Sequence, residues 1–336
     1  MNSISRFLLP LLLLLPVGAA GQQDDSFISD LRAFIDMRAD KAYAKLDSTY
    51  IGRYPYHWNA RLFYNASGLH IVTDGPATVR LSSGMSNRVG IGLDYRGLGL
   101  SYSKALGKHR GLEFSFDSYS PHFCFEYDLR ASVGNIGELE MATTLPDTDA
   151  GLAFFSTKLN LFYSFNPRFS FEAAMKQTRI QRRSAGTFIT ALCWSAWDIA
   201  ALNEDGTLST LDFFKANYFH NRFSLGAGYG YNLVLGHQHW LLHASLVPMW
   251  TVYEMNILRV EYDRTKQNYP FGWVSFAGTG RAGIYYRWGD RWSAGMSGII
   301  DQMVSHNFVR KSHPETVYKR FGSQEWVARF SLYCRF

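Results

Sequence analysis

Between residue 57 and the C-terminus, apolar and polar residues alternate over many short stretches. In 223–235, Phe223 and Leu225 begin an apolar set, while Ser224 and Gly226 begin the polar or small set between them. Successive side chains of a strand point to opposite faces, so this period of two predicts a strand with one apolar and one polar face. The same alternation predicts strands at 58–65, 91–95, 98–103, 112–117, 123–131, 155–164, 169–178, 187–197, 240–246, 282–288, 292–301 and 326–336, with a weaker strand at 78–84.

The N-terminal part of the chain lacks this alternation. Arg6 is followed by an almost uninterrupted apolar run over 7–15 and by small residues at 17–21. This order is typical of a secretory signal peptide, and the apolar run is too short to span a bilayer. We therefore expect residues 1–21 to be removed on export.

Residues 22–56 are predicted to form a periplasmic segment that contains one helix. Within 26–47, Ile28, Leu31 and Ile35 begin a series of apolar residues at helical spacing. A single apolar stripe of this kind favours a surface helix, and we expect it to pack on the mouth of the folded domain or partly inside it. A helix that binds a membrane surface or a partner is the alternative.

The last stretch, 326–336, ends on an aromatic residue. Phe330, Leu332 and Phe336 lie on its apolar face, and Arg329 and Arg335 lie on the other. A final strand of this kind resembles the C-terminal assembly signal of bacterial outer-membrane β-barrels. The resemblance implies recognition by the outer-membrane barrel assembly machinery.

Composition separates a membrane barrel from a soluble, secreted β-sandwich. Aromatic residues make up 16% of the chain and charged residues only 18%, against roughly 25% charged residues in ordinary soluble domains. Trp and Tyr recur near the strand ends, as in the aromatic girdles of membrane barrels. Residues 57–336 are therefore predicted to form an all-β, transmembrane antiparallel β-barrel in the outer membrane, with about 12 strands (10–14 in range). Charges in mid-strand would then line a polar lumen: Asp94, Glu113, Asp117, Glu172, Lys176, Arg281, Arg287, Arg329 and Arg335.

The connections bear on the strand count. Short turns at 236–239 and 289–291 suit the periplasmic side, and the longer connection at 198–221 suits the outside. With a strand at 169–178, the acidic segment 134–149 falls on the periplasmic side, unless one strand between Pro167 and Asn221 is miscounted.

The middle of the chain adds a family resemblance. The stretches 176–179 and 183–188, and above all the Gly-Tyr-Gly-Tyr-Asn run at 228–232, resemble the DUF4421 family of Bacteroidota outer-membrane proteins. The resemblance covers about 47–336. It implies an outer-membrane barrel and no assigned activity.

These observations predict a barrel with a structural or passive-transport role and a partly occluded lumen, in contact with outer-membrane lipid and lipopolysaccharide. The alternative is an enzyme acting on envelope lipids, in which His243 and Ser245 share a face and Asp301 lies on a later strand. We expect no cofactor and no metal, because His237 and His239 bracket a turn without a third ligand and the three Cys are far apart. The net charge of +6 is too diffuse to suggest nucleic acid.

Overall fold

The computed structural model describes residues 25–44, 46–74, 79–83, 85–107, 110–134, 137–141, 152–201, 216–260, 263–269, 274–306 and 320–336. The predicted signal peptide, 1–21, lies outside the described residues. The chain divides into two compact units, one up to Lys41 and one from Ala42 to Phe336. Helix α2 (Asp25–Tyr43) accounts for the described part of the first unit and agrees with the helix predicted at 26–47. Among the described residues, no helix is long and apolar enough to cross a bilayer.

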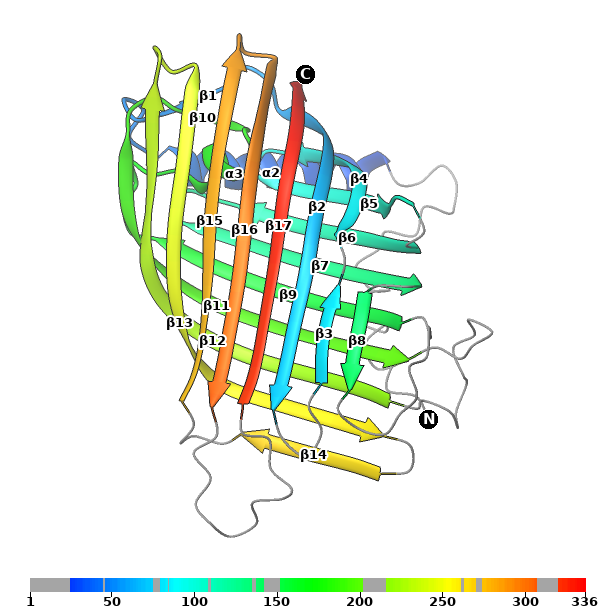
Figure 1. The fold of residues 1–336 in the computed structure, drawn as a ribbon. Coiled ribbons are helices and arrows are strands. Elements are labelled where there is room, and N and C mark those ends of the chain that lie inside the picture. The colour runs from blue at the N-terminus through cyan, green and yellow to red at the C-terminus, as the bar shows by residue number, and fades with distance from the viewer. Residues whose placement is uncertain are drawn as a thin grey trace. The chain divides into compact units, whose positions relative to one another are not determined.

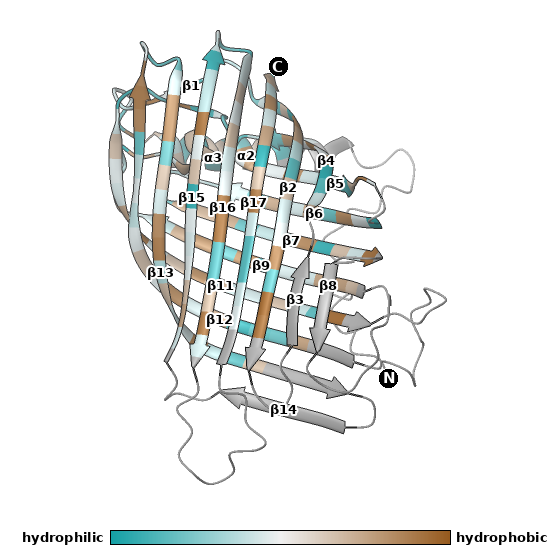
Figure 2. Ribbon diagram, viewed as in Figure 1, coloured by the Kyte–Doolittle hydropathy of each residue, from teal (hydrophilic) through white to brown (hydrophobic). Residues whose placement is uncertain are grey.

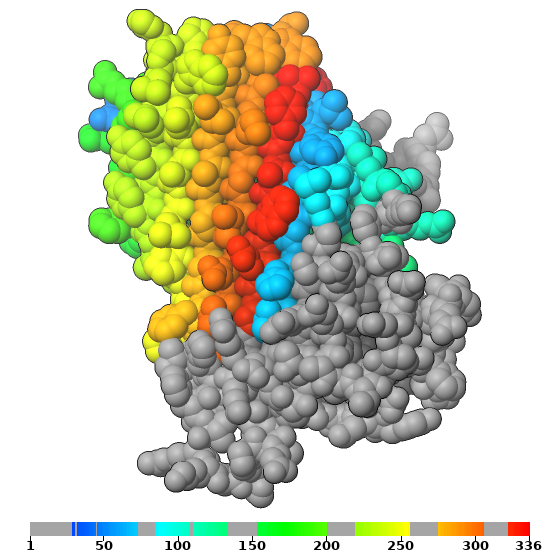
Figure 3. Space-filling model, in the orientation of Figure 1, coloured from blue at the N-terminus to red at the C-terminus, as the bar shows by residue number. Residues whose placement is uncertain are grey.

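The second unit is a closed, antiparallel 12-strand β-barrel (Figure 1). Each strand pairs with the strand before and after it in the ring, and the last strand returns to pair with the first from Arg335↔Asn59 to Arg320↔Asp74. Figure 3 shows this seam, where the C-terminal strand lies beside the first strand of the ring. Closure removes free sheet edges and rules out the soluble β-sandwich. The ring comprises β2 (Trp58–Asp74), β4 (Ser86–Tyr95), β5 (Leu98–Ala105), β6 (Arg110–Tyr119), β7 (Phe123–Gly134), β9 (Leu152–Ser164), β11 (Ala185–Ala201), β12 (Ala216–Leu235), β13 (Trp240–Val260), β15 (Val274–Trp288), β16 (Trp292–His306) and β17 (Arg320–Arg335).

Five short strands lie outside the ring. β3 (Val79–Ser83) and β8 (Gly137–Met141) continue the sheet beyond β2, and β14 (Asp263–Tyr269) pairs with β13. β1 (Ile51–Arg53) and β10 (Arg179–Gln181) form a separate two-stranded sheet. The weaker strand predicted at 78–84 therefore exists, but it does not belong to the ring.

The strand predicted at 169–178 is wrong. This segment begins with the short helix α3 (Phe171–Met175) and leads into β10. The Ser170 side chain caps the helix by accepting a hydrogen bond of 3.0 Å from the backbone N–H of Ala173. In so short a segment, apolar residues at alternate positions fit a buried helical turn as well as a strand.

Removing this strand also settles the strand count. We call the barrel end with the connections 96–97, 120–122, 236–239 and 289–291 the turn end, and the opposite end the loop end. β7 starts at the turn end and finishes with Gly134 at the loop end. β7 therefore ends at the loop end, and the expected alternative of one miscounted strand between Pro167 and Asn221 is the correct one, with the miscounted strand at 169–178.

Many exposed side chains of the strands are apolar and many buried ones are polar. Hydrophobic and hydrophilic residues accordingly alternate along the strands in Figure 2. On β4, Val89, Ile91 and Leu93 are exposed, while Arg88 and Asp94, which flank this run and belong to the opposite face, are buried. Trp240, Tyr286, Trp288 and Trp292 are exposed near the turn end. A soluble protein does not leave so continuous an apolar surface in water, whereas a bilayer covers it. The ring is therefore a transmembrane barrel.

Candidate functional site: an occluded lumen

The polar inner face of the barrel is tied together across the lumen by ion pairs. Arg281 on β15 and Glu126 on β7 form two hydrogen bonds, Nη1 to Oε1 at 2.8 Å and Nη2 to Oε2 at 2.6 Å. β7 and β15 stand almost opposite one another in the ring. The Arg281 guanidinium also lies 4.5 Å from the centre of the Phe162 ring. This bidentate pair therefore joins opposite walls of the barrel.

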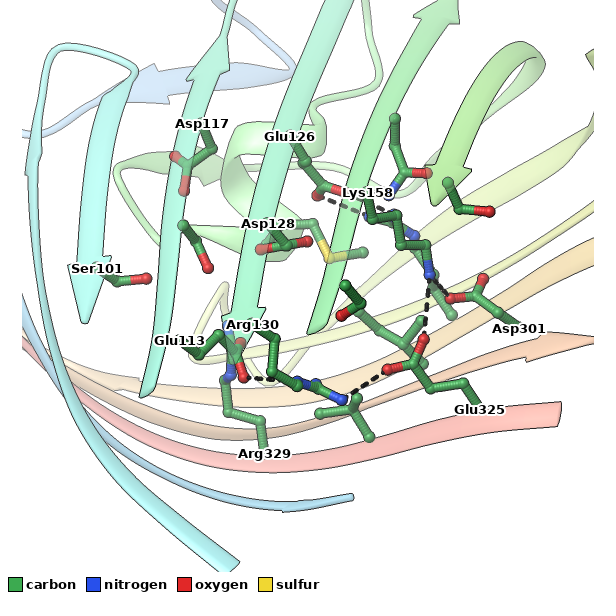
Figure 4. A pocket seen from close by; sticks show the side chains of 18 of the residues that line it. Ser101, Glu113, Asp117, Glu126, Asp128, Arg130, Lys158, Asp301, Glu325 and Arg329 are labelled. Atoms are coloured by element: carbon green, nitrogen blue, oxygen red, sulfur yellow. Dashed lines mark hydrogen bonds and ion pairs between the residues drawn. The ribbon is translucent and has the colours of Figure 1, made fainter. Parts of the chain in front are cut away.

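A second chain of charges crosses the lumen nearer the loop end (Figure 4). Arg130 on β7 bonds Glu325 on β17 at 2.9 Å, and it also lies 3.3 Å from Glu113 on β6. Lys158 on β9 pairs with Asp301 on β16 and lies 3.8 Å from Glu325. β9 and β16, like β7 and β17, are nearly opposite in the ring. These pairs thus close a second level of the lumen.

Residues 165–184, which connect β9 to β11 at the turn end, fold inward; we call them the plug. Phe169, Ala173 and Ala174 of the plug are completely buried. Phe169 and Phe171 join a core cluster with residues of the barrel wall such as Ile189 and Val247. The plug therefore occupies the turn end of the lumen with apolar contacts as well as polar ones.

Lys176, the C-cap of α3, ties the plug to the wall. Its ammonium pairs with Asp117 on β6 and lies 3.6 Å from Asp94 on β4. Gly99 on β5 lies between the two carboxylates, and any Cβ there would collide with both. Asn59 on β2 donates to the Lys176 carbonyl at 3.0 Å and to Asp94 at 3.2 Å. The sequence predicts all three of these charges in the lumen. It places Lys176 on a strand, however, whereas Lys176 caps a helix of the plug.

Glu172 has a different environment in the plug. It accepts a hydrogen bond from Tyr43 and one of 2.7 Å from Thr178, and it lies 3.4 Å from Arg179. Burial, reinforced by the neighbouring Glu172 carboxylate, raises the pKa of the Tyr43 hydroxyl well above its usual range. Tyr43 thus stays protonated and remains a donor to Glu172.

The remaining predicted lumen residues lie at different depths. Arg335 is buried and donates to the plug carbonyl of Gln177 at 2.7 Å. Arg329 is half-buried and donates to Asn65 at 2.8 Å. Arg287 lies at the turn-end rim, where it donates to the Gln238 carbonyl at 3.1 Å. It therefore belongs to the rim and not to the central network.

The structure brings His243 and Ser245 together but not Asp301. His243 Nε2 lies 3.1 Å from Ser245 Oγ, whereas Asp301 is paired with Lys158. The third partner is Asn232, whose Oδ1 lies 2.8 Å from His243 Nδ1. Asn232 in turn donates to the Ser170 carbonyl of the plug at 3.0 Å. The chain of hydrogen bonds therefore runs from the wall into the plug.

A cavity of about 160 Å³ remains among the charged groups. Its lining includes Asp128, Arg130, Lys158, Arg222 and Arg329. This space can hold several waters, and both cations and carboxylates line it. Among the described residues, no group of three or more His, Cys, Asp or Glu could hold a metal ion.

Sequence reasoning missed several of these residues, although the pattern contained them. Glu126, Asp128 and Arg130 occupy alternate positions of β7 and share its inner face. Tyr127 and Leu129 between them belong to the outer face by the same alternation. A stricter count of polar positions in 123–131 would have found the three charges, but not their partners across the barrel.

The family model described as "Domain of unknown function (DUF4421)" matches residues 45–321, most of the chain. The chain belongs to this family. Within the DUF4421 barrel, the matched region includes the plug and all strands of the ring up to the first residues of β17. No curated protein matches the chain.

Solved structures similar to the DUF4421 barrel are bacterial membrane barrels. The outer-membrane protease OmpT of Escherichia coli is 8% identical, with a TM-score of 0.40, and the match covers 84% of this chain and 97% of that one. The toluene transporter TodX of P. putida is 10% identical, with a TM-score of 0.30 and coverages of 84% and 91%. The translocator domain of the autotransporter NalP of Neisseria meningitidis is 12% identical, with a TM-score of 0.32 and coverages of 94% and 100%. At such identities the likeness concerns barrel architecture alone.

Proposed function

We propose that the protein is an integral outer-membrane barrel with a structural role, whose lumen is closed to solutes in its folded state. The observation that carries this proposal is the set of direct ion pairs between opposite walls, foremost Arg281 with Glu126. A porin of this kind of architecture keeps a water-filled channel, with charged side chains lining an open path. Here the charges meet each other instead.

The plug supports the same proposal independently. It fills the turn end, while the cross-lumen pairs close the middle of the barrel. Passive transport would require both closures to open. Each opening would have to separate charged side chains that bond one another directly. Two such systems in series hold the lumen shut without any bound partner.

The location in the envelope is part of the proposal. The lipid-facing outer surface supports residence in the outer membrane, with the turn end in the periplasm and lipid and lipopolysaccharide around the ring. Export by the signal peptide 1–21, membership of the Bacteroidota and insertion through the assembly machinery remain expectations from the sequence. The terminal Phe336 exchanges backbone hydrogen bonds of 3.0 and 3.2 Å with Trp58. The predicted assembly signal is thereby also the strand that closes the ring.

A lipid hydrolase is the second candidate, because Asn232, His243 and Ser245 form a chain in the order orienter, base and nucleophile. Two features argue against it. Asn232 and His243 are 0% and 3% exposed, and they face the plug instead of the bilayer. The amide of Asn232 is also engaged by Ser170 and Gln181 of the plug. This series of hydrogen bonds is better explained as a structural link that fixes the plug to the barrel wall.

Liposome swelling tests the closed lumen, and cell fractionation tests the location. Proteoliposomes that contain the folded protein should swell in small sugars no faster than empty vesicles, and the protein should resist carbonate extraction with heat-modifiable gel mobility. Swelling at the rate of a general porin would overturn the closed lumen. Release by carbonate would overturn the membrane location.

A further inference from the structure

Three arginines contact the short segment 48–50 at the turn end: Arg168, Arg182 and Arg183, which we call the arginine cluster. All three side chains are exposed. The guanidinium groups of Arg168 and Arg183 lie 4.9 and 5.7 Å from the centre of the Tyr50 ring. Arg182 donates to the Ser48 carbonyl at 3.0 Å. Three positive charges held on one short segment of the surface favour an anionic partner.

The acid that contacts the cluster among the described residues is Asp47, which lies 3.2 Å from Arg168 Nε. One carboxylate leaves the three guanidinium groups with an excess of two positive charges. Stacking on Tyr50 and bonding to a backbone carbonyl also hold the side chains in place before any ligand arrives. The cluster is therefore a preorganised site for an anionic group.

The cluster continues directly into the lipid-facing surface. Phe165 precedes Arg168 at the end of β9, and Phe188 follows Arg183 near the start of β11; these two rings are 56% and 71% exposed. The two residues are neighbours, since the Phe165 N–H bonds the Phe188 carbonyl at 3.2 Å. Asn166 fixes the turn between them by donating to the Gly186 carbonyl at 2.7 Å. Apolar rings thus lie at the bilayer and cations lie just beyond it.

We propose that the arginine cluster binds the phosphate of an anionic phospholipid whose acyl chains lie on Phe165 and Phe188. The guanidinium fork matches phosphate oxygens with two hydrogen bonds, and aromatic rings occupy the interface between acyl chains and headgroups. The inference rests on the proposed membrane residence and deepens it, because it assigns a specific lipid site to the rim of the barrel. A cell-wall polymer such as peptidoglycan has no acyl chains and would leave the adjoining rings without a partner.

Native mass spectrometry of the full chain, released from micelles that contain phosphatidylglycerol or phosphatidylcholine, tests the proposal. The wild type should retain phosphatidylglycerol at least about tenfold better than R168Q/R183Q, which loses two charges but keeps Arg182 on its carbonyl. The matched control K104Q/R110Q also removes two exposed charges, at the loop end, and should bind as the wild type does. R168K/R183K should retain the lipid at an intermediate level, because it keeps the charge but loses the fork.

Equal retention by the wild type and R168Q/R183Q would overturn the lipid site, as would equal retention of the two lipids by the wild type. If the wild type but not R168Q/R183Q sedimented with peptidoglycan, and neither retained the lipid, the lipid site would also be overturned in favour of a cell-wall ligand. The proposal of a closed lumen is tested separately, by the swelling rate, which R168Q/R183Q should leave unchanged. Heat-modifiable gel mobility shows that each variant is folded. Loss of membrane residence would remove both proposals together, whereas loss of lipid retention in a membrane-resident protein removes only this one.

Discussion

Arg281 and Glu126 meet from opposite walls of the barrel, where Arg281 Nη1 donates to Glu126 Oε1 and Nη2 donates to Oε2. Arg281 is 6% exposed, and the Tyr119 hydroxyl gives Glu126 a further hydrogen bond of 2.6 Å. Removing one partner of a buried ion pair destabilises the fold far more than replacing both partners, because the remaining charge stays buried without its partner. The pair is therefore a structural tie across the lumen.

This tie predicts an asymmetry between single and double variants. Arg281→Met should lower the free energy of unfolding by about 3–5 kcal/mol, because it leaves Glu126 buried without its partner. R281M/E126L should lose clearly less, since no unpaired charge remains. Urea titration followed by gel mobility measures both. A double variant at least as unstable as Arg281→Met would contradict the tie.

Because hydrogen bonds link Asn232, His243 and Ser245, substitutions at His243 and Ser245 should lower the stability of the barrel without changing the lipids of the envelope. Ser245→Ala should cost about 1 kcal/mol and His243→Ala about 1–3 kcal/mol, because His243→Ala leaves the buried Asn232 oxygen without a partner. Envelope lipid profiles of cells expressing either variant should match those of the wild type. Loss of a lipid product in both variants, with the barrel still folded, would favour the hydrolase.

The seam predicts how the C-terminal residue acts. Deleting Phe336 removes two backbone hydrogen bonds to Trp58 as well as the aromatic ring, so the amount of inserted, heat-modifiable protein should fall severalfold. Phe336→Leu keeps the backbone bonds and should insert better than the deletion variant. Normal insertion of the deletion variant would show that the last residue is dispensable for assembly.

Asp47 predicts a pH-dependent contribution from the turn end. The hydrogen bond from the Thr49 side chain, 2.6 Å long, lowers the pKa of the Asp47 carboxyl. A carboxyl whose pKa is lowered in the folded state stabilises the fold at pH values above its pKa in the unfolded chain, which is about 4. It loses this contribution as the pH falls through the folded-state pKa. The small stability gap between the wild type and Asp47→Asn should thus be present at neutral pH and close in acid. A gap independent of pH would contradict this assignment.

The strand pattern could be predicted because each strand faces two different environments. Val89, Ile91 and Leu93 contact the bilayer while Arg88 and Asp94 face the lumen, so the local sequence carries the signal. The segment 169–178 misled the prediction because it lacks this contrast between lipid and lumen. The plug is buried inside a barrel, and a buried helical turn such as Phe171–Met175 shows no lipid-facing side that would distinguish it from a strand.

The candidate site could be predicted only as a set of inward charges. Glu113, Asp117 and Arg281 are recognisable from their positions, but pairing across a barrel depends on ring closure and on the stagger between strands. Arg130 and Glu325 bond across 195 positions of sequence. Asn232 was missed for a related reason, because an amide in a strand of glycines and tyrosines shows no sign of its contact with the plug.

Conductance across a planar bilayer tests the closed lumen most directly. The wild type should show no steady current above that of the bare membrane. A variant that weakens both closures, K176M/D301N/E325Q, should show resolved current steps, because the plug loses its ammonium and two cross-lumen acids lose their charge. A steady, ohmic current through the folded wild type would contradict the account.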